Sequence, residues 1–349
     1  MKYGKFNYMN IRGAWRLRKT LTQLNRRGII LMYHRVEDLE SDPWNLSVSP
    51  ARFAEHMQII KKLGRPVQMR EMGKSLKRFS FGRKEIVVTF DDGYADNFHN
   101  ARPVLEQNGI PATFFITTGA TDRPQEFWWD EIGRTILTEK MLPEIFDLTI
   151  AGRQYRWQIT PVDQREIIEE SEAIMDTPQN DMSLSRDRLF YVLWKIIDRL
   201  PFLEKKDILQ QVAQWAGASS DPREDHLPMT SKELKTLASS SLFEIGAHTV
   251  HHPMLSRLLP EEQEKEIVCS KHDLEELLNE PITSFCYPHG DYSKETVKIL
   301  KSLRFKNACT VTQGTVERNN DPFLLPRVGV LNWSGVEFEK NLKRWMDAC

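Results

Sequence analysis

The feature that most constrains the fold is a regular alternation of short, β-branched apolar runs with helix-like segments. Such alternation favours parallel βα units, because consecutive parallel strands need a crossover between them. The expected strands cover residues 29–33, 87–90, 112–116, 243–247, 284–287, 307–311 and 324–330. The expected helices cover a segment opening at Ser49-Pro50 and residues 97–108, 260–279, 294–303 and 335–347. We therefore predict a parallel α/β barrel, in which functional groups gather at the carboxyl ends of the strands.

The alternation stops between residues 122 and 229, where apolar residues recur at helical spacing. Helices are expected there over residues 127–138, 164–175 and 185–216, with a short hairpin over residues 149–157. We interpret this part as a mostly helical insertion in a barrel loop. The expected organisation is a basic N-terminal segment over 1–28, barrel over 29–121, the insertion over 122–229, and barrel again over 230–349.

Composition excludes several classes of protein. The chain has 349 residues, of which 40% are hydrophobic, and a formal net charge of −1. This allows a sizeable core and argues against a nucleic-acid-binding protein with a global basic field. No apolar run approaches the roughly 18–20 residues of a membrane span, and no secretory signal is visible. The cysteines match no metal-binding spacing, so we expect free thiols and a reducing, cytoplasmic location.

The N-terminus is strongly basic. Residues 1–36 contain nine lysines and arginines and no acidic residue, and apolar residues are interleaved with them. A basic amphipathic helix of this kind can lie on an anionic membrane surface. A solvated helix that packs one face on the body of the protein is the alternative, and the sequence leaves both open.

Two adjacent carboxylates, Asp91 and Asp92, directly follow an apolar run and precede Gly93. Neighbouring carboxylates repel each other, and one reason to keep them is a cation on one and proton transfer on the other. His248 and His252 lie four residues apart after another strand, so one helical turn would aim both at a shared ion. Alone, each motif could be a turn or a core histidine. Their coincidence at strand ends favours a two-histidine, one-aspartate metal site.

The same groups allow amide hydrolysis. A metal ion lowers the pKa of its water to about 7 and polarises a carbonyl group. Asp91 is the candidate base, and His34, after the first strand, is the candidate acid for the leaving amine, with a core histidine as the alternative. A backbone N–H near Tyr94 is expected to help hold the oxyanion. His251 is an alternative ligand to His252.

In combination, residues 89–94 and 248–253 resemble the polysaccharide deacetylase family, also called the NodB-homology or carbohydrate esterase family 4 group. The resemblance covers residues 29–121 and 229–330. It implies a distorted (β/α)7 barrel that removes N-acetyl groups from amino sugars with the help of a metal ion. The expected partner is an N-acetylated polysaccharide, oligosaccharide or lipid-linked saccharide, with no nucleic acid.

Motif positions imply roles for individual residues. Asp91 would be the base, and Asp92, His248 and His252 would be the ligands of a divalent ion. Zn²⁺ is the default for these ligand types, with Co²⁺, Ni²⁺ or Fe²⁺ as alternatives. Thr249 would steady the histidine loop.

Two departures from the family pattern matter. Many members carry an arginine before the proline of the third motif, but residues 284–290 contain none, so Arg327 is our candidate to orient Asp91. The alternative for Arg327 is a surface or structural arginine. A C-terminal Leu-x-His motif is also absent, and residues 32–36 instead resemble the subgroup whose first strand supplies the acid, here His34. Tyr287 and Pro288 are expected to line the acetyl pocket.

The insertion contains Phe127, Trp128 and Trp129 in a row. Aromatic faces stack on sugar rings, so Trp128 and Trp129 are candidates for a substrate wall, and a place in the insertion's own core is an equally good interpretation. Two other functions stay open. One is hydrolysis of another C–N bond, such as a formamide or cyclic amide, and the other is an inactive carbohydrate-binding barrel.

Overall fold

The computed structural model describes residues 28–77, 84–139, 141–160, 182–219 and 221–347. Seven parallel strands form a closed barrel: β1 (Ile29–Tyr33), β3 (Glu85–Phe90), β4 (Ala112–Ile116), β8 (Phe243–Ala247), β9 (Ser284–Cys286), β10 (Asn307–Gln313) and β11 (Leu325–Gly329). Their order is β1-β11-β10-β9-β8-β4-β3, and pairing of β3 with β1 closes the ring. The short strand β2 (Arg65–Pro66) pairs in parallel with the first residues of β3. The predicted (β/α)7 barrel is confirmed.

The barrel is regular on one side and distorted on the other. Strands β1 and β3 stay in register over five residue pairs, from Ile29 opposite Ile86 onward. Between β8 and β9 the pairing is reduced to Ala247 opposite Phe285, and the β10–β11 register shifts between Cys309 and Gln313. The distortion therefore lies at β8–β11.

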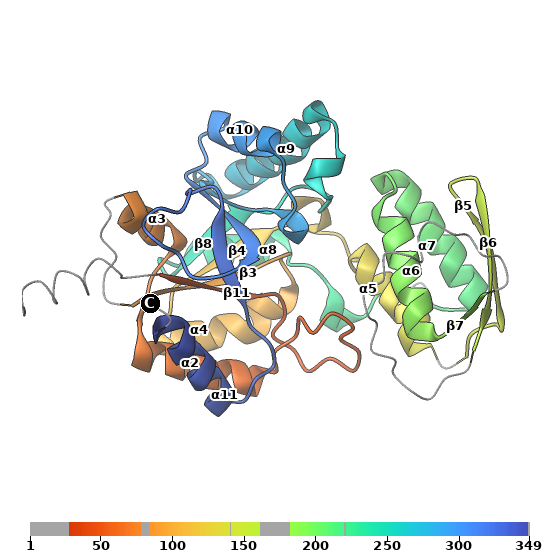
Figure 1. Cartoon of the computed structure of the whole chain (residues 1–349), viewed down its shortest axis with the longest axis horizontal. Helices are drawn as coiled ribbons and strands as arrows, with labels where there is room; N and C mark the ends of the chain where they lie inside the picture. The colour runs from red at the N-terminus through yellow and green to blue at the C-terminus, as the bar shows by residue number, and fades with distance from the viewer. Residues whose placement is uncertain (1–27, 78–83, 140, 161–181, 220, 348–349) are drawn as a thin grey trace, which may run out of the picture.

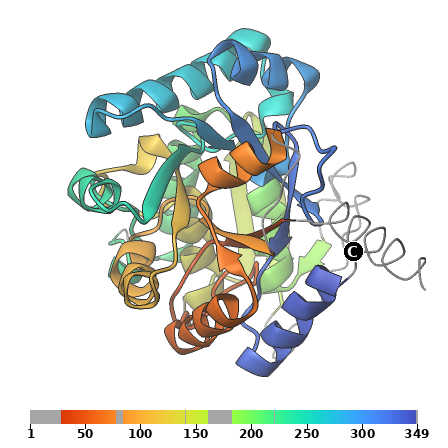
Figure 2. The same ribbon diagram turned by 90° about the vertical axis from the view of Figure 1, so that its left-hand side faces the viewer.

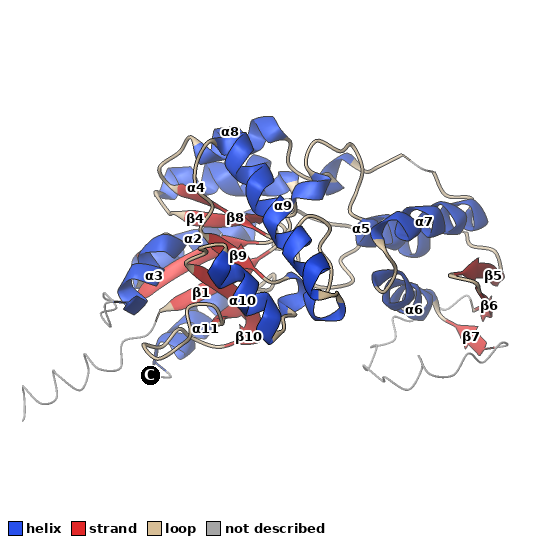
Figure 3. Ribbon diagram, turned by 90° about the horizontal axis from the view of Figure 1, so that it is seen from above, coloured by secondary structure: helices blue, strands red, loops and turns tan. Residues whose placement is uncertain are grey.

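Helices surround the strands, as Figure 2 shows along the barrel and Figure 3 shows from the side. They are α2 (Pro50–Leu63), α4 (Arg102–Asn108), preceded by a π-helical turn over Asn97–Ala101, α9 (Pro260–Leu278), α10 (Lys294–Ser302) and α11 (Gly335–Asp347), all of which the sequence predicts. Two further helices, α3 (Met69–Lys77) and α8 (Ser231–Ala238), were not predicted. Helix α8 begins with a capping box in which Thr230 and Glu233 satisfy each other's backbone N–H groups.

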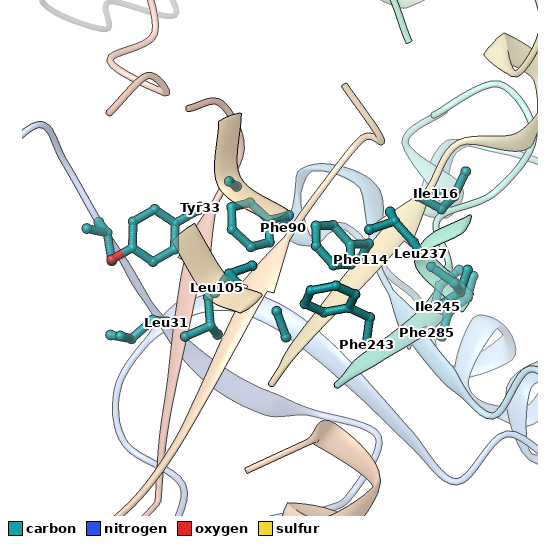
Figure 4. Packing of buried hydrophobic residues seen from close by; sticks show 14 of the residues in the cluster. Leu31, Tyr33, Phe90, Leu105, Phe114, Ile116, Leu237, Phe243, Ile245 and Phe285 are labelled. Carbon is teal, nitrogen blue, oxygen red and sulfur yellow. The ribbon is translucent and has the colours of Figure 1, made fainter. Parts of the chain in front are cut away.

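Aromatic side chains pack between the barrel strands and the helices around them (Figure 4). Phe90 and Phe114 stack with ring centroids 4.9 Å apart, and Phe243 meets Phe114 edge-on at 5.5 Å. All six residues of β3 are buried, as expected of a parallel strand covered on both faces. This core fixes the strand ends that carry the polar residues described below.

The insertion has its own core and stands beside the barrel, with its small sheet outermost (Figure 1). It comprises α5 (Trp128–Gly133), a π-helical turn over Arg134–Thr138, β5 (Ile145–Ile150), β6 (Arg153–Ile159), β7 (Met182–Leu184), α6 (Arg186–Asp198) and α7 (Phe202–Ala216). The predicted hairpin turns at Ala151 and Gly152, but it is longer than expected, and β7 adds a third strand in parallel to β6. The insertion is therefore mostly helical with a predicted hairpin, and only the third strand of its sheet was not predicted.

Some expectations lie outside the described residues. These are the basic N-terminal helix within residues 1–28 and the helix over 164–175. Within the described part of the chain, none of the helices combines the length and the apolar character that crossing a membrane requires.

Candidate active site

The polar residues singled out in the sequence meet at the carboxyl ends of the barrel strands. Asp91 and Asp92 follow β3, His34 follows β1 and His248 follows β8, while Arg327 projects from β11. Parallel strands end on the same rim, so segments far apart in sequence come together there. The structure therefore unites these five residues at one end of the barrel.

Asp92 faces two imidazole rings. Its Oδ1 lies 3.5 Å from His248 Nε2 and 3.3 Å from His252 Nε2, and all three residues are buried. His248 Nδ1 lies 2.8 Å from the Cys286 carbonyl oxygen. A carbonyl only accepts, so Nδ1 carries the proton in the neutral ring and the Nε2 lone pair points towards Asp92. Asp92 Oδ1 is enclosed and has no hydrogen-bond partner among the described residues. The lone pairs of Asp92 Oδ1 and of the two Nε2 atoms face one another, and a cation between them could bind all three.

The charge states of Asp92 and His252 suit metal binding, whereas His248 must give up a proton to bind an ion. Burial raises the pKa of Asp92, but the close approach of His248 and His252 outweighs burial and holds that pKa well below its usual range. Burial lowers the pKa of His252 despite the nearby carboxylate, so that ring stays neutral. Burial also disfavours a charge on His248, but Cys286 and Asp92 outweigh it and raise its pKa. A proton on His248 therefore competes with an ion for this position.

The backbone around the cluster is unusual. Asp92, Thr249 and His252 have left-handed φ values of 72°, 64° and 58°, which non-glycine residues rarely adopt. Gly93 follows with φ 94°, a conformation that explains why a glycine stands there. The helical turn expected over residues 248–252 does not form. Thr249 Oγ1 instead accepts the His252 N–H at 3.0 Å, so the threonine lies where it can steady the loop.

Asp91 lies beside this cluster and is bound by Arg327. The guanidinium donates from Nη1 to Oδ1 and from Nη2 to Oδ2, both at 2.7 Å. Both side chains are buried, and Nε donates to the Thr310 carbonyl oxygen at 2.9 Å. Burial raises the pKa of Asp91, but the charge and hydrogen bonds of Arg327 lower it to about 2. Arg327 thus contacts Asp91 in the orienting geometry expected of it.

Cys286 explains how an arginine from β11 reaches Asp91. Cys286 occupies the third-motif stretch where an arginine was expected, and Arg327 Nη2 lies 3.0 Å from its sulfur. The small side chain leaves room for the guanidinium. Burial raises the pKa of Cys286 to about 11, so it remains a thiol. The described cysteines Cys269, Cys286 and Cys309 are free, as predicted.

His34 lies on the open side of Asp91. Its Nε2 is 3.9 Å from Asp91 Oδ2, which is too long for a hydrogen bond, and its side chain is 17% exposed. Nε2 is therefore within reach of a group bound beside Asp91. His251, the alternative ligand, points elsewhere, since its Nδ1 lies 2.7 Å from Glu266 Oε1.

Tyr94 and the two tryptophans connect the rim to the insertion. Tyr94 Oη donates to Asp130 Oδ2 at 2.6 Å and accepts from Trp129 Nε1 at 2.7 Å. Burial raises the pKa of Asp130 to about 7. The Trp129 ring lies 4.9 Å from that of His252, and Trp128 and Trp129 are each only 8% exposed. Both belong to the insertion's core, and a substrate wall stays a prediction.

Tyr287 also has a core position. Its side chain is fully buried, its hydroxyl donates to the Phe323 carbonyl oxygen at 2.9 Å, and its ring packs on Phe285 and Tyr292. Pro288 is buried in the adjoining 3₁₀ turn, Pro288–Gly290. Lining of the acetyl pocket by Tyr287 and Pro288 stays a prediction.

Comparison with known proteins places this site in a family. The sequence model described as polysaccharide deacetylase matches residues 80–142 and 200–308. The chain belongs to the polysaccharide deacetylase family. Its enzyme class is that of carbohydrate N-deacetylases.

Proteins similar in sequence and in structure agree with this match. YxkH of Bacillus subtilis, provisionally assigned as a polysaccharide deacetylase, is 22% identical over 305 residues, which cover 86% of this chain and 70% of YxkH. The deacetylase PplD of Streptococcus pyogenes, solved in complex with acetate, has a TM-score of 0.58 at 20% identity and covers 92% of this chain and 98% of its own. IcaB from Ammonifex degensii has a TM-score of 0.55 at 17% identity, covering 92% and 97%. At these identities the two structures establish the barrel of this polysaccharide deacetylase and no more.

Sequence reasoning missed part of the rim. His289 packs on His252 with ring centroids 4.5 Å apart, and Asp198 approaches His289 from the end of α6. His289 stands in the third-motif stretch, which was a usable signal. No sequence pattern indicated Asp198, because its position near His289 depends on how the insertion packs against the barrel.

Proposed function

We propose that this polysaccharide deacetylase uses a divalent metal ion to remove the acetyl group from an N-acetylated amino sugar in a polysaccharide, oligosaccharide or lipid-linked saccharide. The observation that carries the proposal is the enclosed, unpartnered Asp92 Oδ1 that faces two imidazole nitrogens within 3.5 Å. A second carboxylate stands beside it and is bound separately by Arg327. Asp92, His248 and His252 would hold the ion, and their two nitrogens and one oxygen suit Zn²⁺, with Co²⁺, Ni²⁺ and Fe²⁺ as alternatives.

Individual residues of the chain have separate roles in the proposed reaction. When bound, a divalent ion supplies Lewis acidity that polarises the acetyl carbonyl and acidifies water. Asp91 is ionised throughout the neutral range, because its pKa is about 2, and it accepts the proton of the attacking water. The two bonds from Arg327 fix this carboxylate, so little reorganisation is needed during the reaction.

His34 completes the reaction on the leaving-group side. Water adds to the acetyl carbon, the C–N bond breaks, and acetate and a free amine result. His34 Nε2 donates the proton that the departing nitrogen requires, since it stands 3.9 Å from Asp91 and forms no hydrogen bond with it. The Tyr94 N–H has no carbonyl acceptor among the described residues, which leaves it free for the oxyanion.

Acetate release tests the proposal. The purified chain should release acetate from N-acetylglucosamine oligomers or from lipid-linked N-acetylated saccharides, lose this activity with a chelator, and regain it with Zn²⁺. Formamides and cyclic amides serve as competing substrates. Cleavage of those alone, or turnover that survives complete metal removal, would contradict the proposal.

The membrane contact suggested by the basic N-terminus is a separate proposal. It would bring a cytoplasmic enzyme to a lipid-linked substrate. Flotation with anionic liposomes should fall when residues 1–24 are deleted. Unchanged flotation of the shortened chain would refute it.

A further inference from the structure

The insertion meets the barrel rim directly beside the proposed metal ligands. His289, in the turn after β9, lies between His252 and the end of α6, where Asp198 Oδ1 is 3.9 Å from His289 Nε2. The Trp194 ring stands edge-on to His289 at 5.8 Å. His289 has a left-handed φ of 56°, so the chain accepts an uncommon backbone conformation to place this ring.

In the described part of the chain, several enclosed polar atoms in this cluster lack partners, among them His252 Nδ1 and two atoms that face each other. Neither Asp198 Oδ1 nor His289 Nε2 has a hydrogen-bond partner among the described residues. The other Asp198 oxygen, Oδ2, accepts from Arg257 Nη1 at 2.9 Å, and the Asp198 side chain is only 2% exposed. Leaving buried polar atoms unsatisfied is costly, so their position calls for an absent partner.

The distance between these two atoms specifies what that partner can be. At 3.9 Å they are too far apart to bond to each other, but one oxygen atom can lie within hydrogen-bonding distance of both. Asp198 Oδ1 can only accept, while His289 Nε2 donates or accepts according to its tautomer. A hydroxyl group, which both donates and accepts, matches this pair.

We propose that Asp198 and His289 bind one hydroxyl group of the glycan, beside the N-acetyl group that is cleaved, and so determine which sugars are accepted. This inference rests on the proposed deacetylase function. The hydroxyl donates to Asp198 Oδ1 and makes its second hydrogen bond with His289 Nε2. His289 lies against His252, so the bound hydroxyl belongs to the reacting sugar or its immediate neighbour.

Two further observations support a role in recognition. Lys205, from α7, is 6% exposed, and its ammonium lies 4.4 Å from the centre of the Trp128 ring without a described carboxylate at ion-pairing distance. Burial lowers the pKa of Lys205 to about 8, and Asp198 is close enough to oppose that shift. The family match also omits residues 143–199, so Asp198 belongs to a part of the insertion that the family pattern does not cover. A residue that lies outside the family pattern and beside the site is a suitable position for distinguishing one glycan from another.

The test uses the full chain and monodeoxy analogues of an N-acetylglucosamine oligomer that the wild type deacetylates. Loss of the critical hydroxyl should lower the wild-type kcat/KM by about 10- to 100-fold, as expected for a hydrogen bond to a charged group. Asp198→Ala should lower kcat/KM on the parent oligomer by a similar factor. It should then treat parent and deoxy analogue alike, within about threefold, with unchanged metal content.

Arg257→Gln is the matched control. Like Asp198→Ala, it removes the ion pair between Arg257 and Asp198, but it leaves Asp198 Oδ1 in place. It should retain the wild-type discrimination between parent and analogue. If Asp198→Ala folds poorly, Asp198→Asn keeps the side-chain volume and should still weaken discrimination. A wild type that accepts every deoxy analogue equally would show that the pair holds only a water molecule and would overturn the inference. So would Arg257→Gln behaving like Asp198→Ala. A wild type that releases no acetate from any N-acetylated glycan would instead refute the proposed function.

Discussion

The buried ion pair between Asp91 and Arg327 gives a sharp prediction about stability. Arg327→Met leaves the Asp91 carboxylate buried without its counterion. The pKa of Asp91 falls from 3.8 to about 2, which corresponds to about 2 kcal/mol at 1.36 kcal/mol per unit. Burial opposes that shift, so the attraction of Arg327 exceeds this figure, and loss of one partner of a buried pair typically costs about 3–5 kcal/mol. We expect Arg327→Met to lower the free energy of unfolding by that amount at pH 7.

The double variant separates the pair from other effects. Asp91→Asn with Arg327→Met removes both charges, so its cost should be at least about 2 kcal/mol smaller than the sum of the single variants. Urea unfolding in the presence of a chelator measures all four proteins without metal. Stabilisation of the wild type by this pair is fully present above pH 3.8 and is lost as the pH falls through about 2. The deficit of Arg327→Met should therefore shrink in acid. Costs that add within about 0.5 kcal/mol, or a deficit independent of pH, would refute this reasoning.

Two further predictions concern histidines. His34→Gln should lower turnover by about 10²- to 10⁴-fold with unchanged metal content, since it removes only proton transfer to the amine. Acetate release and metal content are measured on the same sample of this variant. Near-normal turnover would exclude His34 as the acid. His56 is buried against Phe338, with Nε2 at 2.9 Å from the Trp333 carbonyl oxygen, and burial lowers its pKa to about 4. The unfolded chain therefore binds the extra proton between pH 6.5 and about 4, and His56 should account for about 3 kcal/mol of stability lost over that range. A His56→Gln variant whose pH–stability curve falls as steeply as that of the wild type would contradict this.

The fold was accessible from the sequence because its strands carry a strong local signal. Parallel strands buried on both faces appear as short apolar runs, and every predicted strand is present within a few residues. The site followed from the same signal, since parallel strand ends share a rim. That logic brought Asp91, Asp92, His34 and His248 together although they lie far apart in the sequence, whereas Arg327 was proposed because the third motif lacks its arginine.

Features that depend on tertiary contacts escaped prediction. The His248–His252 segment is a turn with left-handed residues, which spacing alone did not distinguish from a helical turn. Strand β7 has no periodicity of its own and forms by pairing with β6. The approach of Asp198 to His289 requires the insertion to dock on the rim, and no local pattern records that.

The central claim is that Asp92, His248 and His252 hold the ion while Asp91 only moves a proton. The most direct test measures metal content and acetate release on the same sample of Asp91→Asn. The account predicts about one equivalent of metal, as in the wild type, with turnover abolished. Loss of the metal together with activity, or full turnover by the variant, would contradict it.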